Sequence, residues 1–207
     1  MDEQEARMAA PDLVVAANGG VPGGVLKPHN CHEAALGWVL MAKYPTLRGV
    51  DALSHGAPKA WMSIRSLAER YGQGSPKQLT GQWMGQHIYN RGYVRVQPLP
   101  PRGGAKLPPF TNATFLVGDV LFMGNRMAPH HSMVVVQKNG AQAFARGFNN
   151  AGAFGGPFMD WDPALRDVTD MTRWDPQGRF KGNNGPCELY AITYNTISQN
   201  IPDNLNF

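Results

Sequence analysis

The sequence predicts an α+β fold in which N-terminal helices pack on an antiparallel β-sheet. Apolar residues recur at helical spacing between about residues 31 and 92, whereas short apolar or alternating runs dominate from residue 118 onward. Helices first and strands afterwards is the order of an α+β layout. The 207 residues are enough to bury a hydrophobic core.

Three helices are predicted in the first half of the chain. Asn30 can cap a helix over residues 31–43, whose apolar stripe contains Trp38. A second helix over residues 60–72 ends at a glycine. A third lies within residues 75–92, where two internal glycines weaken it.

Strands and turns are predicted in the second half. The dipeptide Asn139-Gly140 is typical of a two-residue hairpin turn, and the last strand is expected to return to the sheet. The tripeptide WDP occurs twice and predicts Asp-Pro turns anchored by tryptophan. The predicted strands cover residues 93–97, 118–124, 131–138, 141–148 and 188–195.

The composition of the chain indicates which kinds of partner and which cellular location to expect. The net charge is +4, but the basic residues are scattered, so we expect no nucleic-acid partner. No apolar segment reaches membrane-spanning length, and the acidic opening lacks the basic region of a secretory signal peptide. We therefore expect a protein that is cytoplasmic in the producing cell, with no membrane contact. Two cysteines are too few for a disulfide scaffold.

The stretch HNCHEAALGWVLMAKY places one of these cysteines, Cys31, at the start of the first predicted helix. A thiol is nucleophilic as thiolate, and the N–H groups and dipole of a helix start lower its pKa. The same N–H groups can hold an oxyanion. Such a cysteine also needs an imidazole base and a polar group that orients it. His130 and His131 begin a predicted strand and are candidates for the base.

The motifs NCHEAALGWVL, GDVLF and HSMVVV together resemble the papain-like thiol hydrolases, in particular NlpC-type cell-wall peptidases and YopT-type effector proteases. The resemblance implies a papain-like catalytic domain over residues 29–207, preceded by an irregular arm over residues 1–28. It also implies Cys31 as nucleophile and His131 as base. Two departures stand out: Asn30-Cys31-His32-Glu33 replaces the usual Asp-Cys-Ser-Gly, and the papain oxyanion glutamine has no counterpart.

The predicted hairpin register places Asn149 and Asn150 near the two histidines, as candidates for the third catalytic residue. With Asn139-Gly140 as the turn, His131 lies opposite Phe148 and His130 lies opposite Asn149. A single β-bulge would exchange these pairings. We take Asn149 as the orienting amide, with Asn150 and Asp160 as alternatives.

Other clusters have simpler interpretations. His29, Cys31, His32 and Cys187 have the side chains of a zinc site, but their local spacing is too tight, so no metal and no cofactor is expected. Cys187 is interpreted as a small buried residue. Glu33 is a favourable first-turn charge, and His29 and His32 are interpreted as bystanders.

The expected function is that of a cysteine hydrolase that cleaves an amide bond, acting as a bacterial effector or toxin on peptidoglycan peptide or on a target protein. An effector would also have an immunity protein or a chaperone as partner, and a specialised secretion system could export it. Two alternatives stay open. One is a protein glutamine deamidase or transglutaminase-like effector, and the other is a non-catalytic binding module with a buried Cys31.

Overall fold

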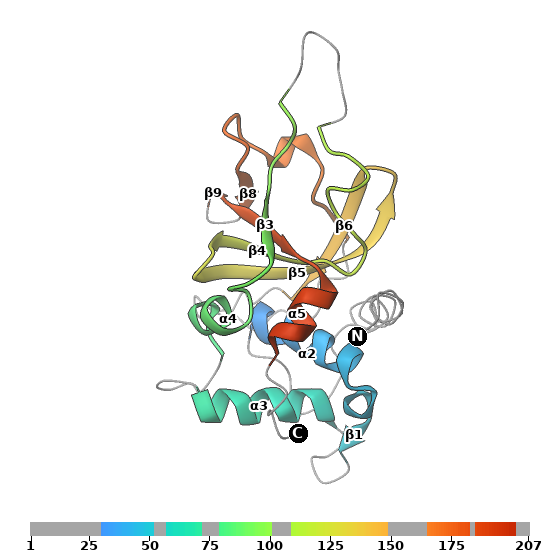
Figure 1. Cartoon of the computed structure of the whole chain (residues 1–207), viewed down its shortest axis with the longest axis vertical. Helices are drawn as coiled ribbons and strands as arrows, with labels where there is room; N and C mark the ends of the chain where they lie inside the picture. The colour runs from blue at the N-terminus through green and yellow to red at the C-terminus, as the bar shows by residue number, and fades with distance from the viewer. Residues whose placement is uncertain are drawn as a thin grey trace.

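The computed structural model describes residues 30–51, 57–71, 79–100, 109–148, 165–182 and 185–201. Figure 1 shows a sheet with helices α2 (Cys31–Lys43), α4 (Gly81–His87) and α5 (Tyr194–Asn200) along one side and helix α3 (Lys59–Tyr71) beyond them. This mixture of helices and antiparallel strands confirms the α+β class. The predicted arm, residues 1–28, lies outside the described residues.

The bounds of α2 and α3 lie within one residue of those predicted. The helices are α2 (Cys31–Lys43), α3 (Lys59–Tyr71), α4 (Gly81–His87) and α5 (Tyr194–Asn200), with short 3-10 turns η1 (Pro45–Arg48) and η4 (Met171–Arg173). The largest sheet is built from β3 (Tyr93–Val96), β4 (Val120–Asn125), β5 (Ala128–Asn139), β6 (Gln142–Gly147), β7 (Arg166–Asp167) and β10 (Leu189–Ile192). Two smaller pairs are β1 (Val50–Asp51) with β2 (Ala57–Pro58), and β8 (Phe180–Gly182) with β9 (Gly185–Cys187).

In the described residues, the large sheet has the strand order β3-β10-β4-β5-β6-β7, with antiparallel neighbours throughout. The last strand, β10, returns to the sheet as predicted and pairs with both β3 and β4. The two faces of the sheet bury different clusters. Val134 and Val136 of β5 join the cluster that includes the helices, whereas Met133 and Val135 join a second cluster around Trp174.

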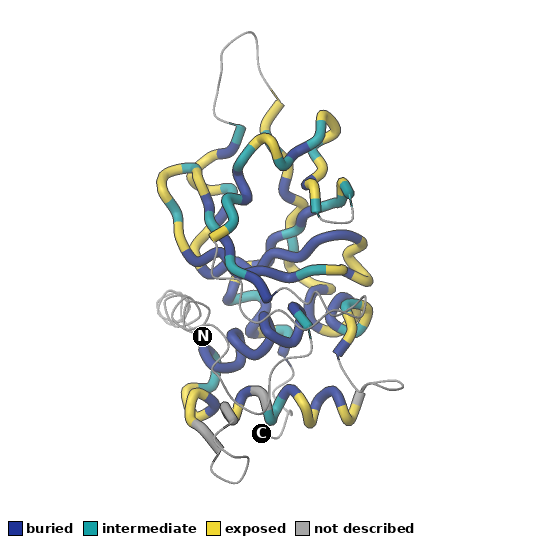
Figure 2. The backbone as a smooth tube through the Cα atoms, turned by 180° about the vertical axis from the view of Figure 1, so that it is seen from behind, coloured by how far each residue is buried: buried dark blue, intermediate teal, exposed yellow. Residues whose placement is uncertain are grey.

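Helix α2 lies at the centre of the molecule. Its bounds and its Asn30 cap agree with the prediction, because the Asn30 side chain accepts hydrogen bonds from the main-chain N–H groups of His32 and Glu33. The predicted apolar stripe is too narrow, however: every residue from 31 to 42 is buried. The helix contacts β5, α3 and α5, and Figure 2 shows it as a continuously buried segment. A helix covered on several sides has no exposed polar face.

Helix α4 is shorter than predicted, and its glycines have a tertiary reason. A Cβ on Gly81 would lie 1.8 Å from the Pro129 carbonyl oxygen, and one on Gly85 would lie 2.6 Å from Met127. Two glycines four residues apart therefore let α4 approach the β4–β5 turn closely. The sequence interpretation, that these glycines weaken the helix, missed this packing.

The hairpin differs from the prediction in both turn and register. Asn139 pairs with Gln142, so the turn residues are Gly140 and Ala141. A bulge at Val136 then shifts the pairing, and Met133 pairs with Gly147 where the predicted register would give Arg146. Helix α5, capped by Thr193, was not predicted at all.

Candidate functional site

Cys31 is the first residue of α2, as predicted, and only 6% of it is exposed. Its thiol donates to the main-chain oxygen of His130, with 3.9 Å between Sγ and the oxygen. The Ser132 main-chain N–H points back to the sulfur. The thiol therefore contacts the strand on both sides of His131.

The acidity of this thiol is opposite to the prediction. Burial raises the pKa of Cys31 to about 11, although the main-chain N–H groups of Ser132, Cys31 and His32 lower it. The predicted lowering by the helix start is therefore wrong, because the loss of hydration outweighs the N–H groups. At neutral pH the thiol is protonated.

The two histidines lie at a bulge where β5 begins. Met123 of β4 pairs with His131 and Gly124 pairs with Pro129, so His130 is the extra residue between them. A Cβ placed on Gly147 would lie 3.1 Å from His131 Nε2 and 3.0 Å from Met133 Cγ. The His131 ring thus leans toward β6, over the same face as Met133.

His130 differs from His131 in exposure. It is exposed, and partial burial lowers the pKa of its imidazole. Its Nδ1 would lie 2.3 Å from a Cβ on Gly124, whose φ of +99° favours glycine. The predicted orienting residue, Asn149, and its alternatives Asn150 and Asp160 lie outside the described residues.

A buried polar network, which the sequence analysis missed, lies beside the thiol. His32 Nδ1 is 2.8 Å from Ser132 Oγ, and the Tyr89 hydroxyl is 2.8 Å from the same oxygen. His32 also donates to the Pro129 carbonyl. Burial lowers the pKa of His32 to about 3 and raises the pKa of Tyr89, so both groups are neutral. His32 is therefore not a bystander but a bonded residue of the core.

The helix start also holds the chain that leads into α4. Asn30 Nδ2 donates to the Leu79 carbonyl at 2.8 Å, and Glu33 Oε1 accepts from the Leu79 N–H at 2.9 Å. Glu33 is only 1% exposed, so it is more than a surface charge near a helix start. Both main-chain groups of Leu79 are satisfied by the turn that carries Cys31.

The Gly-Asp motif before β4 has a structural role. Asp119 Oδ2 accepts from the Leu116 N–H at 2.8 Å, and Gly118 has a φ of +92°, which favours glycine. Burial raises the pKa of Asp119 to about 6. The motif therefore shapes the turn that starts β4, beside the strand that carries the histidines.

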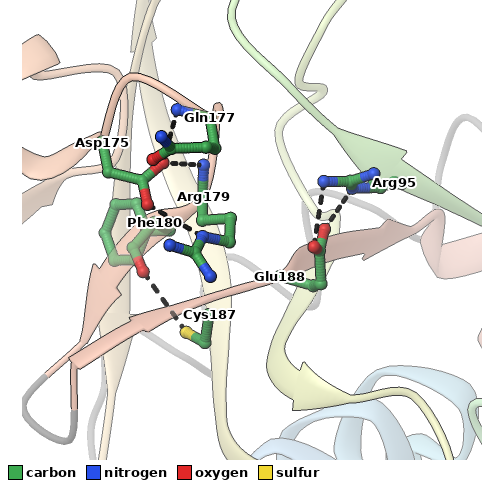
Figure 3. A network of polar contacts seen from close by, with 7 residues as sticks. All are labelled: Arg95, Asp175, Gln177, Arg179, Phe180, Cys187 and Glu188. Carbon is green, nitrogen blue, oxygen red and sulfur yellow. Dashed lines mark hydrogen bonds and ion pairs between the residues drawn. The ribbon is translucent and has the colours of Figure 1, made fainter.

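The second cysteine lies in a different setting. Cys187 of β9 donates to the Phe180 carbonyl at 3.4 Å, near the Asp175–Arg179 and Arg95–Glu188 ion pairs (Figure 3). Among the described residues, no group of three or more His, Cys, Asp or Glu side chains could hold a metal ion. The second WDP copy forms the expected turn, because Trp174 is buried and Asp175 accepts from the Gln177 N–H. The first copy lies outside the described residues.

No protein-family model and no curated protein matches this chain. In the part of the chain that the structure describes, no helix is both long enough and apolar enough to cross a membrane.

Proposed function

We propose that this protein is a thiol-dependent amide hydrolase of papain-like arrangement, with Cys31 as nucleophile and His131 as general base. One observation carries the proposal: the Cys31 thiol contacts the main chain on both sides of His131. This contact brings the start of α2, where Cys31 lies, to the start of β5, where His131 lies, although the two are far apart in the sequence. A Cys–His site is identified by the arrangement and roles of its groups and not by their positions in the sequence.

Acylation begins when His131, as the neutral imidazole, takes the Sγ–H proton while the sulfur attacks the amide carbonyl carbon. The new C–S bond gives a tetrahedral oxyanion. Asn30 caps the N–H groups of His32 and Glu33, so we assign the Cys31 N–H to the oxyanion. The C–N bond then breaks, and His131 returns the proton to the leaving amine.

Deacylation uses the same groups in reverse. Water attacks the thioester carbon while His131 accepts one of its protons. The C–S bond breaks, the carboxylic acid leaves, and the proton returns to the Cys31 sulfur. Asn149 is proposed to orient His131, with Asn150 and Asp160 as the alternatives.

The raised pKa of Cys31 decides the timing of proton transfer. With a thiol pKa near 11, little thiolate exists at neutral pH, so the proton leaves during the attack and not before it. The proposal is therefore general-base catalysis of a buried thiol, in place of a preformed thiolate–imidazolium pair.

A peptidoglycan peptide or a target protein is the proposed substrate, and an effector role is proposed from the resemblance to cell-wall peptidases and effector proteases. The proposal includes an immunity protein or a chaperone as partner and export by a specialised secretion system. Attack on a glutamine side chain would make the same site a deamidase, or a transglutaminase if an amine replaced water. Hydrolysis, deamidation and transamidation would share the same acylation step.

A second candidate function is a non-catalytic binding module. The burial and protonation of the Cys31 thiol favour it, because a thiol that only packs has these properties. The two functions differ in one consequence: only the hydrolase needs the Cys31 sulfur for product formation.

The test is incubation of the wild-type protein and Cys31→Ala with purified peptidoglycan and with candidate target proteins. Mass spectrometry of the products distinguishes peptide-bond cleavage from replacement of a glutamine amide NH₂ by OH. We expect products with the wild type alone. Products of equal yield from Cys31→Ala, or none from either protein, would contradict the hydrolase.

Two histidine variants then identify the base. His131→Ala should reduce hydrolysis about a hundredfold to ten-thousandfold, the range of general-base catalysis. His130→Ala should leave most of the activity, since His130 is exposed and lies in the bulge. The reverse pattern would assign the base to His130.

A further inference from the structure

We propose that His32 is a positioning residue, which together with Ser132 and Tyr89 holds the start of β5 so that His131 stays beside Cys31. This inference rests on the proposed hydrolase and adds to it a residue that does not touch the reacting atoms. Cys31 and His32 are consecutive in the first turn of α2, and each contacts β5. The first turn of α2 therefore contacts the start of β5 at two places.

The contacts of His32 span the segment that carries the histidines. Its Nδ1 meets Ser132 Oγ at 2.8 Å, and its other ring nitrogen donates to the Pro129 carbonyl. His130 and His131 lie between these two anchors, at the point where the β4–β5 pairing has its bulge. A bulge leaves an unpaired residue in the ladder, so the segment needs anchors from outside the sheet.

The proton positions in this network follow from the acceptors. The Pro129 carbonyl can only accept, and Nε2 of His32 is the ring nitrogen next to it, 2.9 Å from the same Gly81 Cβ position. Neutral His32 has one N–H, so that proton is on Nε2 and Nδ1 is an acceptor. Ser132 therefore donates its hydroxyl proton to Nδ1, and Tyr89 donates its own to Ser132.

Each hydrogen bond in the network of His32, Ser132 and Tyr89 then has a defined donor and a defined acceptor. His32 is 5% exposed, Ser132 and Tyr89 are fully buried, and Gly81 of α4 closes the space beside the ring. A fully satisfied buried network holds one arrangement, whereas removal of one member leaves an unsatisfied group. His32 stays neutral between two anchors, so it does not compete with His131 for the thiol proton.

The network makes a specific prediction for thiol exposure. Loss of the Ser132 hydroxyl leaves His32 Nδ1 without its donor and frees the segment that covers the Cys31 sulfur. Water would then reach the thiol, and the pKa of Cys31 would fall from about 11 toward its ordinary value near 9. Because the thiolate is the reactive form, alkylation should become faster.

The experiment measures iodoacetamide labelling of both cysteines at pH 8 by peptide mass spectrometry, in full-length wild type, Ser132→Ala, Tyr89→Phe and Tyr93→Phe. Cys187 is the internal control for global unfolding. Tyr93→Phe is the matched control, because it removes a hydroxyl that bonds Arg126 outside the network. We expect Cys31 labelling to rise at least about tenfold in Ser132→Ala and about threefold in Tyr89→Phe.

Cys187 labelling should stay at the wild-type rate in all variants, and Tyr93→Phe should behave as wild type. Unchanged Cys31 labelling in both Ser132→Ala and Tyr89→Phe would overturn the proposal, as would equal increases at both cysteines. If Ser132→Ala fails to fold, Tyr89→Phe alone decides between these outcomes.

A kinetic measurement separates this inference from the proposed function. Where the wild type hydrolyses a substrate, Tyr89→Phe should lower kcat about threefold to tenfold and leave KM unchanged, since the network acts on the base and not on substrate binding. A change in KM alone would overturn the positioning role. Absence of any Cys31-dependent hydrolysis would instead contradict the hydrolase, and the labelling result would still test the network.

Discussion

The two cysteines of this chain are alike in several respects. Each thiol donates to a main-chain carbonyl, the Cys31 thiol to His130 and the Cys187 thiol to Phe180, and burial raises the pKa of both. Neither shows the acidity of a preformed thiolate. Burial and thiol pKa therefore do not by themselves distinguish a candidate nucleophile from a packing residue.

The surroundings of the two thiols differ. Cys31 begins a central helix and lies at a strand start with two histidines, beside a buried network of neutral polar groups. Cys187 lies in a three-residue strand of a two-stranded sheet, next to ion pairs that are partly exposed. The proposed hydrolase therefore uses Cys31, where main-chain N–H groups and the strand that carries the histidines meet the thiol. The following predictions test this difference, beginning with the largest effect.

Substitution of each cysteine by serine should affect hydrolysis very differently. Cys31→Ser should lower the rate by about a thousandfold or more, because a hydroxyl is a far weaker nucleophile at this site. Cys187→Ser should change it less than about twofold. Rates are measured as product release from the substrate found in the incubation test. Similar losses in both variants would remove the distinction between the two thiols.

The pH dependence of labelling should reflect the raised pKa of Cys31. Below a pKa near 11, the thiolate fraction grows tenfold per pH unit, so the labelling rate should rise about a hundredfold between pH 7 and pH 9 and level off only near pH 11. Peptide mass spectrometry follows each cysteine separately. A plateau for Cys31 already at pH 8 would show an activated thiol and contradict the burial argument.

His32 should make the protein less stable in acid. Its folded pKa of about 3 lies below the ordinary value of 6.5, so the unfolded state binds a proton first as the pH falls. The contribution of His32 to the free energy of unfolding should therefore drop from about pH 6.5 downward, with a slope of up to about 1.4 kcal/mol per pH unit. Asp119, whose pKa is raised to about 6, contributes in the opposite direction, so the effect of His32 is read from the difference between the wild type and a His32 variant.

Urea denaturation of wild type and His32→Gln between pH 4 and pH 7 measures this slope. His32→Gln lowers the stability at pH 7 but removes the titrating group, so its slope should be smaller. His87→Gln is the control, because His87 lies on α4 outside the network. Equal slopes in wild type and His32→Gln would argue against a buried neutral His32.

A methyl group at Gly81 should disturb the packing of α4 against His32 and Pro129. The added Cβ would meet the Pro129 carbonyl at 1.8 Å and His32 Nε2 at 2.9 Å, so Gly81→Ala should cost about 1–3 kcal/mol of the free energy of unfolding. Gly49→Ala is the matched control, since its nearest neighbour would lie 3.8 Å away. Denaturation of the two variants measures the difference, and a neutral Gly81→Ala would contradict the close approach of α4.

The sequence predicted those elements whose signals are local. Helix α2 starts and ends where predicted, because the Asn30 cap and the apolar periodicity act within the helix itself. The α5 signal was also local, a Thr193 cap followed by Thr196, but it was interpreted as the continuation of a strand. The hairpin register was lost at the turn, which lies at Gly140-Ala141 and not at Asn139-Gly140 and so shifts the pairing by two residues. The bulge at Val136, which has no sequence signature, reduces this shift to one residue.

The candidate site was predicted only in part, since its properties depend on tertiary contacts. Cys31 and the start of β5 do meet. The raised thiol pKa follows from how deeply α2 is buried, which a window of sequence does not contain. His32 was overlooked for the same reason, because its partners Ser132 and Tyr89 are distant in the sequence.

The central claim is that the Cys31 sulfur forms a covalent acyl intermediate, and peptide mass spectrometry of protein quenched during turnover tests it most directly. The wild-type protein is mixed with substrate, quenched in acid and digested, and the mass of each cysteine-containing peptide is measured. We predict an acyl adduct on the Cys31 peptide, none on the Cys187 peptide, and a longer-lived adduct when His131→Ala slows deacylation. Product formation at the wild-type rate by Cys31→Ala, with no adduct on Cys31, would contradict the account.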